Sequence, residues 1–331
     1  MTNPSGRGSP KRIVVVLGIA LGLICVAGAI AYVVHRHPVS ISFETEWALD
    51  IDTGPSWAKM TPAAGISHPV LTTADVHDVK AEFLADPFMV KVKDDWYMFF
   101  EVMNSLTHHG DIGCATSGDG LHWKYLKIVL DEPTHLSYPY VFEDGGQFYM
   151  IPENADGGAI RLYRATDFPY SWTPVSVLLR GAFSDTCVFF KDGTWWMLTC
   201  SKPYTHDELR LFFADQLTGP WTEHPESPVV RGNPTRAQCG GRILVTNEGV
   251  IRFTHEDYPT YGKKLRAFFI TELTRTKYAE KEFPGNPVLK AQGKGWNRHG
   301  MHHMDAHETA PGKWIAVVDG YRKHLAIRIE Y

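Results

Sequence analysis

The sequence predicts an all-β fold, a five-bladed β-propeller of four-stranded blades, preceded by one transmembrane helix. Five related segments begin at residues 86, 138, 185, 240 and about 303. A spacing of about 50 residues is typical of propeller blades. A second strand–turn–strand unit follows each of the first four segments. The helix is predicted from the one long apolar run, residues 13–34, which carries no charge.

The first hairpin of each blade is clearest in three segments that align without gaps. These segments cover residues 86–101, 138–153 and 185–200, and each has an apolar strand, a polar or Gly-containing turn, and an aromatic-rich strand. Turns of this kind between two β-prone runs predict β-hairpins. Weaker copies cover residues 240–255 and about 303–319.

The second unit of each blade ends in a strand opened by an aromatic residue, and only the fifth blade lacks it. The aromatic residues are Trp123, Trp172, Trp221 and Tyr278. After Asp319 the chain has enough residues for one more strand, so a fourth strand is missing. Because an open sheet edge leaves backbone groups unpaired, we expect residues 41–52 to supply it. The propeller is then predicted over residues 81–331, with a linker and closing strand over 35–80.

The apolar run at residues 13–34 is long enough to span a bilayer, which takes about 20 residues. Arg7, Lys11 and Arg12 precede it, so residues 1–12 are predicted to form a basic cytosolic tail. The propeller then lies on the extracytoplasmic side of a single-pass membrane protein. A cleaved signal peptide is the competing interpretation, although its apolar core usually has about 7–15 residues.

Composition excludes several classes of protein. The apolar fraction of 44% excludes a disordered chain. A net charge of −4 argues against a nucleic-acid partner. Four cysteines follow the apolar run, at positions 114, 187, 200 and 239. Their spacing shows no metal-binding pattern, and two disulfides or four buried thiols remain open.

The repeat register predicts where acidic residues meet. In a hairpin, the first residue of one strand and the last residue of the next lie at the same end. If the first strand of each blade lines the channel, Asp86, Glu101, Glu153 and Asp185 gather at one mouth of the ring. Neighbouring carboxyls raise one another's pKa, and glycoside hydrolysis uses such a pair as acid and base. Each of these acids could instead cap a turn or lie on a solvated rim.

The segment from 301 to 308, MHHMDAHE, is the second candidate for chemistry. In an extended strand His303, Asp305 and His307 point to one side, and they could hold a divalent metal ion at the propeller axis or order a water. A hydrogen-bonded structural cluster is the alternative, and no cofactor is certain. Candidate substrate-binding residues are Tyr138, Trp96, Arg242 and His302.

Several motifs carry a resemblance to a known family. They are ADPF (85–88), WYMFFE (96–101), SYPYVFEDGGQFYMIPE (137–153), GPWTEHPESPVV (219–230) and GMHHMDAH (300–307). Together they resemble the N-terminal domain of plant glucosamine inositolphosphorylceramide transferases and its stand-alone bacterial relatives. That domain in turn is similar to the five-bladed propeller of furanosidase-type glycoside hydrolases.

The resemblance implies carbohydrate chemistry, with two departures. In the plant proteins sugar transfer belongs to a separate C-terminal domain, which this sequence lacks. Furanosidase-type enzymes open their first three inner strands with Asp, Asp and Glu, whereas this sequence has Asp86, Tyr138 and Asp185. Glu101 or Glu153 would then supply the acid.

Three functions follow as hypotheses. The first is a membrane-anchored, glycoside hydrolase-like propeller that acts on extracytoplasmic glycans or glycolipids, with Asp86 as base and Glu153 as acid. The second is a non-catalytic glycan- or glycolipid-binding module that works with a partner glycosyltransferase. The third is a glycosyltransferase in its own right, for which the sequence shows no nucleotide-binding motif.

Overall fold

The computed structural model describes residues 22–23, 25–26, 28, 32 and 39–329 of the chain. Residues 45–322 form one compact unit, and residues 1–44 with 323–331 form another. No helix in the described ranges is long and apolar enough to cross a membrane. The predicted anchor at residues 13–34 and the basic tail lie outside those ranges, apart from residues 22, 23, 25, 26, 28 and 32.

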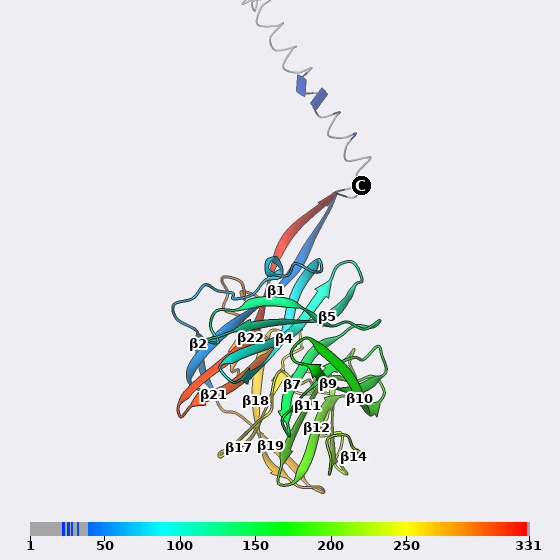
Figure 1. Ribbon diagram of the computed structural model, residues 1–331. Coiled ribbons are helices and arrows are strands. Elements are labelled where there is room, and N and C mark those ends of the chain that lie inside the picture. Colours follow the sequence, from blue (N-terminus) through cyan, green and yellow to red (C-terminus); the bar gives the residue numbers. More distant parts are fainter. Residues whose placement is uncertain (1–21, 24, 27, 29–31, 33–38, 330–331) are drawn as a thin grey trace, which may run out of the picture. The chain divides into compact units, whose positions relative to one another are not determined.

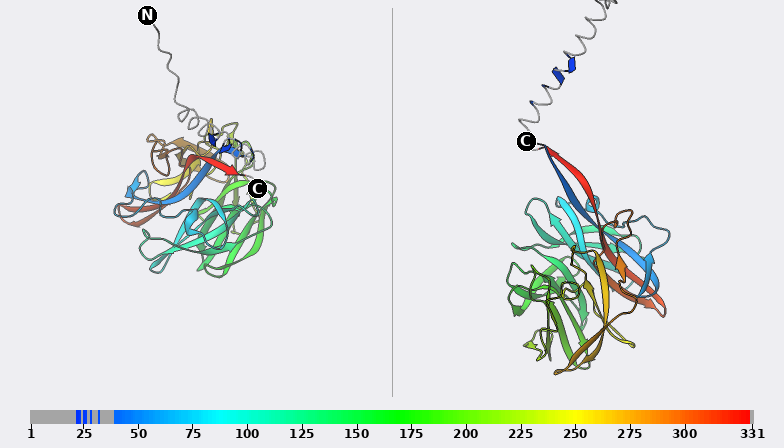
Figure 2. Two further views of the ribbon diagram at one scale, coloured as in Figure 1. Left: turned by 90° about the horizontal axis from the view of Figure 1, so that it is seen from above. Right: turned by 180° about the vertical axis from the view of Figure 1, so that it is seen from behind.

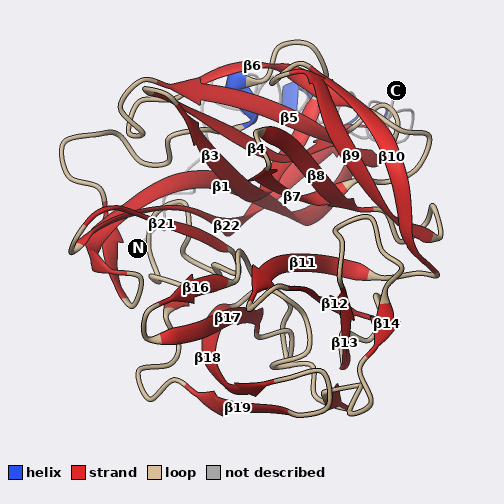
Figure 3. Cartoon of the chain, turned by 60° about the horizontal axis from the view of Figure 1, so that its bottom comes forward, coloured by secondary structure: helices blue, strands red, loops and turns tan. Residues whose placement is uncertain are grey.

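The prediction of an all-β five-bladed propeller is confirmed, because the strands form five separate antiparallel sheets (Figures 1 and 3). Blade 1 consists of β3 (Ala81–Val92), β4 (Asp95–Asn104), β5 (His109–Ser117) and β6 (Lys124–Leu130). Blade 2 consists of β7 (Ser137–Asp144), β8 (Gln147–Glu153), β9 (Ala159–Asp167) and β10 (Ser171–Arg180). In both blades the strands pair in chain order.

Blades 3 and 4 have the same order with one extra short strand each. Blade 3 contains β11 (Ser184–Lys191), β12 (Thr194–Cys200), β13 (Glu208–Ala214) and β14 (Thr222–Glu223), with β15 (Val230–Arg231) beside β13. Blade 4 contains β16 (Leu244–Thr246), β17 (Gly249–His255), β18 (Lys264–Leu273) and β19 (Tyr278–Glu282), with β20 (Leu289–Lys290) beside β18.

Blade 5 joins the two ends of the propeller. Its order is β2 (Lys59–Pro62), β1 (Val39–Ser56), β22 (Lys313–Ile329) and β21 (Met304–Ala310), and Figure 2 shows β1 and β22 side by side from two directions. Residues 41–52 lie in β1, next to β22. The N-terminal region supplies two strands rather than the expected one, because residues 313–329 form a single continuous strand where two were expected. A short 3₁₀ helix, η1 (Thr73–Asp75), lies in the connection to blade 1.

Aromatic side chains fill the space between neighbouring blades. Phe99 of β4 packs against Phe168 and Trp172 of blade 2, with ring centroids 5.9 and 5.4 Å apart. Trp57, in the turn between β1 and β2, packs against Phe253 of β17 at 5.7 Å. Edge-on ring packing of this kind adds to the apolar area that each sheet buries. The aromatic second strands of the repeat therefore hold adjacent blades together.

The inner strands meet closely around one glycine, Gly241. Its φ is +138°, and an added Cβ would lie 1.9 Å from the carbonyl oxygen of Met304 in blade 5. Its backbone N–H donates to the Tyr138 hydroxyl of blade 2 at 2.8 Å. Three blades therefore meet at a position where no side chain fits.

Gly241→Ala is expected to lower the free energy of unfolding by about 3 kcal/mol or more, because the new methyl group both clashes and strains the backbone. Chemical denaturation of the full chain measures this. Gly146→Ala is the control: φ there is +77° with nothing within 4 Å, so its cost should be the backbone strain alone, about 1–2 kcal/mol. Equal costs for the two variants would contradict the tight junction.

Candidate functional site

The first residue of the repeat has an unusual backbone in each of the first three blades. Asp86, Tyr138 and Asp185 have φ of 53°, 45° and 48°, in the left-handed region. At each one the pairing of the first two strands shifts register, as in a β-bulge. Left-handed backbone costs about 1–2 kcal/mol at a non-Gly residue. Strain repeated at equivalent positions is typical of functional sites, where a bulge re-aims a side chain.

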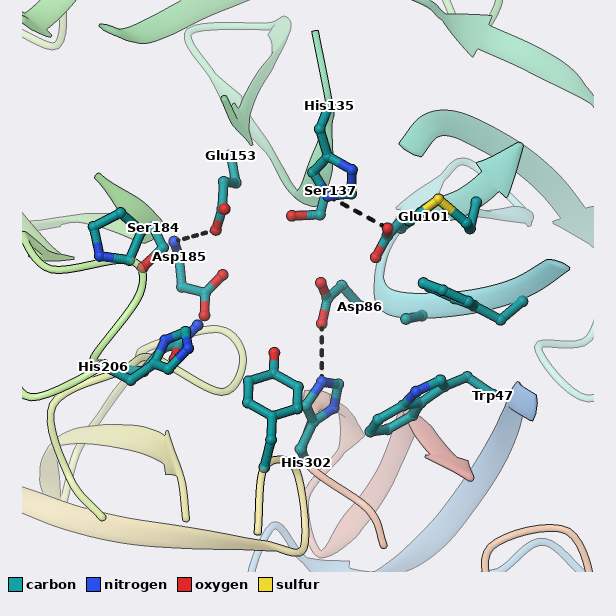
Figure 4. Close-up of a pocket in the computed structure, with 16 residues that line it drawn as sticks. Trp47, Asp86, Glu101, His135, Ser137, Glu153, Ser184, Asp185, His206 and His302 are labelled. Carbon is teal, nitrogen blue, oxygen red and sulfur yellow. Dashed lines mark hydrogen bonds and ion pairs between the residues drawn. The ribbon is translucent and has the colours of Figure 1, made fainter. Parts of the chain in front are cut away.

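A cavity of about 290 Å³ lies where these bulges meet, and we call it the carboxyl cavity. It is lined by Trp47, Phe83, Ala85, Asp86, Glu101, Met103, His135, Ser137, Glu153, Ser184, Asp185, Pro203, His206, Gln238, Tyr261 and His302. The four carboxyls expected to gather at one mouth all line it, and Figure 4 shows them directed toward a common space. No lysine or arginine is among these lining residues.

The strand register explains why Glu101 and Glu153 join the two aspartates. Glu101 of β4 pairs with Ala85, and Glu153 of β8 pairs with Ser137. Each glutamate therefore lies opposite the residue just before a bulge. The two ends of each hairpin meet at the cavity, as the repeat register predicts.

Asp86 is linked to a buried histidine that carries charge. His302 Nε2 lies 3.7 Å from Asp86 Oδ1, and His302 Nδ1 lies 2.8 Å from Asp319 Oδ1. Burial lowers the pKa of His302, but the Asp319 and Asp86 carboxylates outweigh it and raise the pKa to about 9. Burial raises the pKa of Asp86 to about 6, and the charge of His302 limits that rise. At neutral pH Asp86 is therefore an ionised carboxylate.

Glu153 and Asp185 form a carboxyl pair across from Asp86. The Asp185 backbone N–H donates to Glu153 Oε2 at 3.1 Å. Burial raises the pKa of Glu153 to about 7, opposed by hydrogen bonds from Asp185. Burial and the Glu153 charge raise the pKa of Asp185 well above its usual range. Since the two groups titrate together, the pair retains at least one proton at neutral pH.

Glu101 lies beside a histidine whose orientation is fixed by the backbone. The Gly110 N–H donates to His135 Nδ1 at 2.9 Å, so Nε2 carries the proton of the neutral ring. That nitrogen lies 3.5 Å from Glu101 Oε1. Burial lowers the pKa of His135. Burial, followed by the charges of Asp86 and Glu153, raises the pKa of Glu101 well above its usual range.

Aromatic rings cover one side of the cavity. The Trp47 ring lies 4.3 Å from the His302 ring, and the Tyr261 ring lies 5.5 Å from it. Trp47 comes from β1 and Tyr261 from the loop between β17 and β18. An apolar wall opposite charged groups is typical of sites that bind small molecules.

Of the four residues predicted to bind substrate, only His302 lines the carboxyl cavity. Tyr138 is fully buried, and its hydroxyl contacts Gly241 and Cys187 instead. Trp96 borders a different hollow, with Lys91 and Trp314. Arg242 forms an ion pair with Asp305 at 2.7 Å. Internal partners therefore satisfy the polar groups of Tyr138 and Arg242.

The expected metal triad does not assemble. Asp305 accepts hydrogen bonds from the Met89 N–H at 2.7 Å and from Arg242 Nε at 2.7 Å, and it lies 3.1 Å from His307 Nε2. His303 is fully buried and lies 3.8 Å from Asp86 Oδ1. Residues 302 and 303 precede β21, so the prediction that their side chains alternate between the two faces of a strand does not apply to them. In the described part of the chain, the metal-capable group at the cavity is Asp86, His302 and Asp319, with ligand atoms within 4.8 Å.

Sequence reasoning missed several residues of the site. His255 ends the second strand of blade 4, and Asp319 lies within β22 of blade 5, at the positions that correspond to Glu101 and Glu153 in blades 1 and 2. The same register rule would have found both. His135 and Trp47 lie outside the repeat, so no signal in the sequence pointed to them. The four cysteines at 114, 187, 200 and 239 are buried, unbridged thiols.

The chain is thus a five-bladed β-propeller with a carboxyl-lined cavity among its inner strands. Residues 44–321 match the family described as glucosamine inositolphosphorylceramide transferase 1, N-terminal, and the chain belongs to that family. It is 35% identical over 304 residues to glucosamine inositolphosphorylceramide transferase 1 of Oryza sativa subsp. japonica, covering 84% of this chain. The match spans 40% of the length of that relative.

Solved structures share the fold. A putative glycosidase from Bacteroides thetaiotaomicron superimposes with a TM-score of 0.59 at 14% identity, covering 80% of this chain and 97% of that one. An α-L-arabinofuranosidase from Podospora anserina superimposes with a TM-score of 0.52 at 12% identity, covering 72% and 90% of the two chains. The propeller architecture is therefore one that glycosidases also use.

Asp319→Asn is expected to lower the pKa of His302 well below its value of about 9, because the carboxylate that contributes most against the cost of burial is lost. NMR titration of the histidine side chains measures this.

The folded pKa of His302 exceeds its ordinary 6.5, so its stabilising effect is complete below pH 6.5 and lost as pH rises through about 9. The stability gap between wild type and variant should narrow over that window. Asp119→Asn, at an exposed His122 pair, is the control; an unchanged His302 pKa in Asp319→Asn would contradict the charged pair.

Proposed function

We propose that the carboxyl cavity cleaves glycosidic bonds by acid–base chemistry, in the manner of glycoside hydrolases. The observation that carries this proposal is that four carboxyls from three blades line one cavity whose lining includes no lysine or arginine. Burial raises the pKa of Asp86 to about 6 and that of Glu153 to about 7, and it raises the pKa of Asp185 well above its usual range, so the carboxyls differ in protonation near neutral pH. Two carboxyls held in different protonation states are what general acid–base catalysis requires.

The roles follow from this split. The Asp86 carboxylate takes a proton from a water molecule as the water oxygen attacks the anomeric carbon of the sugar. Glu153 donates its proton to the glycosidic oxygen as the bond from that oxygen to the anomeric carbon breaks. Besides burial, the charge of Asp86 raises the pKa values of Glu101 and Glu153, whereas hydrogen bonds from Asp185 lower the pKa of Glu153. The charge of His302 limits the rise in the pKa of Asp86 that burial causes.

The cavity favours a small uncharged ligand. Its volume of about 290 Å³ lies at the small end of ligand pockets, which span roughly 300–1,000 Å³. Its lining has no lysine or arginine to bind a phosphate group, so a sugar diphosphate donor fits poorly. A terminal neutral sugar, stacked on Trp47 or Tyr261, suits it better.

We further propose that residues 13–34 anchor the propeller to a membrane and that its substrate is an extracytoplasmic glycan or glycolipid.

A second function is supported by the family relationship. The relatives are named as transferases, and this chain matches only 40% of the length of the rice protein. The propeller would then bind a glycan or glycolipid and present it to a partner glycosyltransferase. Under this alternative the cavity carboxyls hold sugar hydroxyls and no bond is broken.

The two functions are separated by a screen of the full-length chain against furanoside and pyranoside substrates, with sugar release and binding measured together. Asp86→Asn and Glu153→Gln should each lower the rate of sugar release by about 10²–10⁴-fold, because each removes the proton acceptor or donor. Glu143→Gln is the matched control, since Glu143 is exposed near the turn of β7. Retention of sugar without release in wild type would support the binding module instead.

The rate of sugar release should follow a narrow, bell-shaped pH profile. Activity should fall as pH drops through about 6, where Asp86 gains a proton, and again as pH rises through about 7, where Glu153 loses one. A pH profile of kcat/KM gives both limbs. A rate that stays flat from pH 5 to pH 9 would contradict these acid and base assignments.

A further inference from the structure

A second group of metal-capable side chains lies outside the carboxyl cavity. His109 and Asp111 belong to the start of β5, and Asp131 follows the end of β6. Each offers one ligand atom, and the three atoms lie within 4.8 Å of one another. None of the three lines the carboxyl cavity.

Asp111 presents an unsatisfied oxygen to this group. Its side chain is 2% exposed. Oδ2 accepts a hydrogen bond from Asn104 Nδ2 at 3.1 Å. Oδ1 is also buried, and no residue in the described part of the chain donates a hydrogen bond to it. His109 Nδ1 lies 3.3 Å from Oδ1. A buried carboxylate oxygen without a donor is costly, so it needs a further partner.

The charges of the group point to a cation as that partner. Among the ion pairs of the described residues, none joins Asp111 or Asp131 to a lysine or arginine. Two carboxylates close together repel each other unless a proton or a cation lies between them. Burial and the Asp131 carboxyl raise the pKa of Asp111, so a bound cation would replace that proton. His109 is the one basic side chain of the group, and its ring is 18% exposed. Asp131 is exposed, so the group can be reached from solvent.

We propose that His109, Asp111 and Asp131 bind a divalent cation of the Mn²⁺ or Zn²⁺ class. One imidazole nitrogen with two carboxylate oxygens suits these ions, whereas Ca²⁺ prefers oxygen ligands alone. Zinc lies about 2.0–2.2 Å from such ligands, so ligands of one ion are at most about 4.4 Å apart. The three ligand atoms lie within 4.8 Å of one another, close to that spacing.

The position of the group indicates that a bound ion would stabilise the connection between blade 1 and blade 2. Asp131 begins the segment that connects blade 1 to blade 2, and this segment is already tied to Gly110. The Leu136 N–H donates to the Gly110 carbonyl at 2.9 Å, and Gly110 N–H donates to His135. A bound ion fastens the start of the same segment to β5 and so stabilises the residues that place His135 beside Glu101.

The proposal is tested by calorimetric titration of the full-length chain, stripped with EDTA, with MnCl₂ and separately with ZnCl₂. Wild type should bind one equivalent of at least one of the two ions. Asp111→Asn and Asp131→Asn should each weaken that binding at least about 10-fold, because loss of a group that only supports a ligand already weakens metal binding by about 10–100-fold. Asp131 is exposed, so its substitution tests the site even where Asp111→Asn does not fold.

His122→Ala is the matched control, because His122 pairs with Asp119 at 2.7 Å on the surface, and no metal-capable group found among the described residues includes this pair. Its metal affinity should equal that of wild type. Absence of binding in wild type, or unchanged affinity in Asp131→Asn, would overturn the proposal. Since the readout is metal binding alone, the result is independent of whether the carboxyl cavity cleaves sugars.

Discussion

Two buried carboxylates of blade 5 hold the seam where the propeller closes, and the rest of the site depends on them. Asp319 Oδ2 accepts the Asp86 N–H at 3.1 Å, and Asp305 Oδ2 accepts the Met89 N–H at 2.7 Å. Both acceptors therefore bind backbone donors of β3, the first inner strand of the ring. The same Asp319 also binds His302. One residue thus joins the last blade to the first, fixes the bulge at Asp86 and sets the charge beside it.

The buried acids differ in how far a nearby cation offsets the cost of burial. Asp305 is paired with Arg242 and Asp319 with His302, and these cations hold both acids ionised against the cost of burial. The carboxyls of the cavity have no arginine or lysine partner, so burial and mutual repulsion raise their pKa values. The acids with lowered pKa values stay ionised and join neighbouring blades, whereas the cavity acids, with raised pKa values, can exchange protons near neutral pH. Local electrostatics therefore separates the structural acids from the candidate catalytic ones.

The repeat in the sequence predicted the ring and the four cavity carboxyls, because strand register alone decides which hairpin ends meet. It did not predict which buried polar groups satisfy one another. Asp305 has the residue types of a metal site around it, yet Arg242 from another blade occupies its oxygens. Tyr138 aligns with Asp86 but bonds to Gly241, 103 residues away. Such pairings depend on contacts between different blades, and an alignment of the repeats with one another gives no information about those contacts.

The cavity acids differ in protonation because the charge of His302 offsets the burial of Asp86, whereas no lysine or arginine lines the cavity beside the other three. Carbon-13 NMR titration of side-chain carboxyls in the full chain, assigned by the variants Asp86→Asn and Glu153→Gln, measures this directly. We expect Asp86 to titrate near pH 6, Glu153 near pH 7, and Glu101 and Asp185 well above their ordinary range. Four carboxyls that all titrate near pH 4, as exposed acids do, would contradict it.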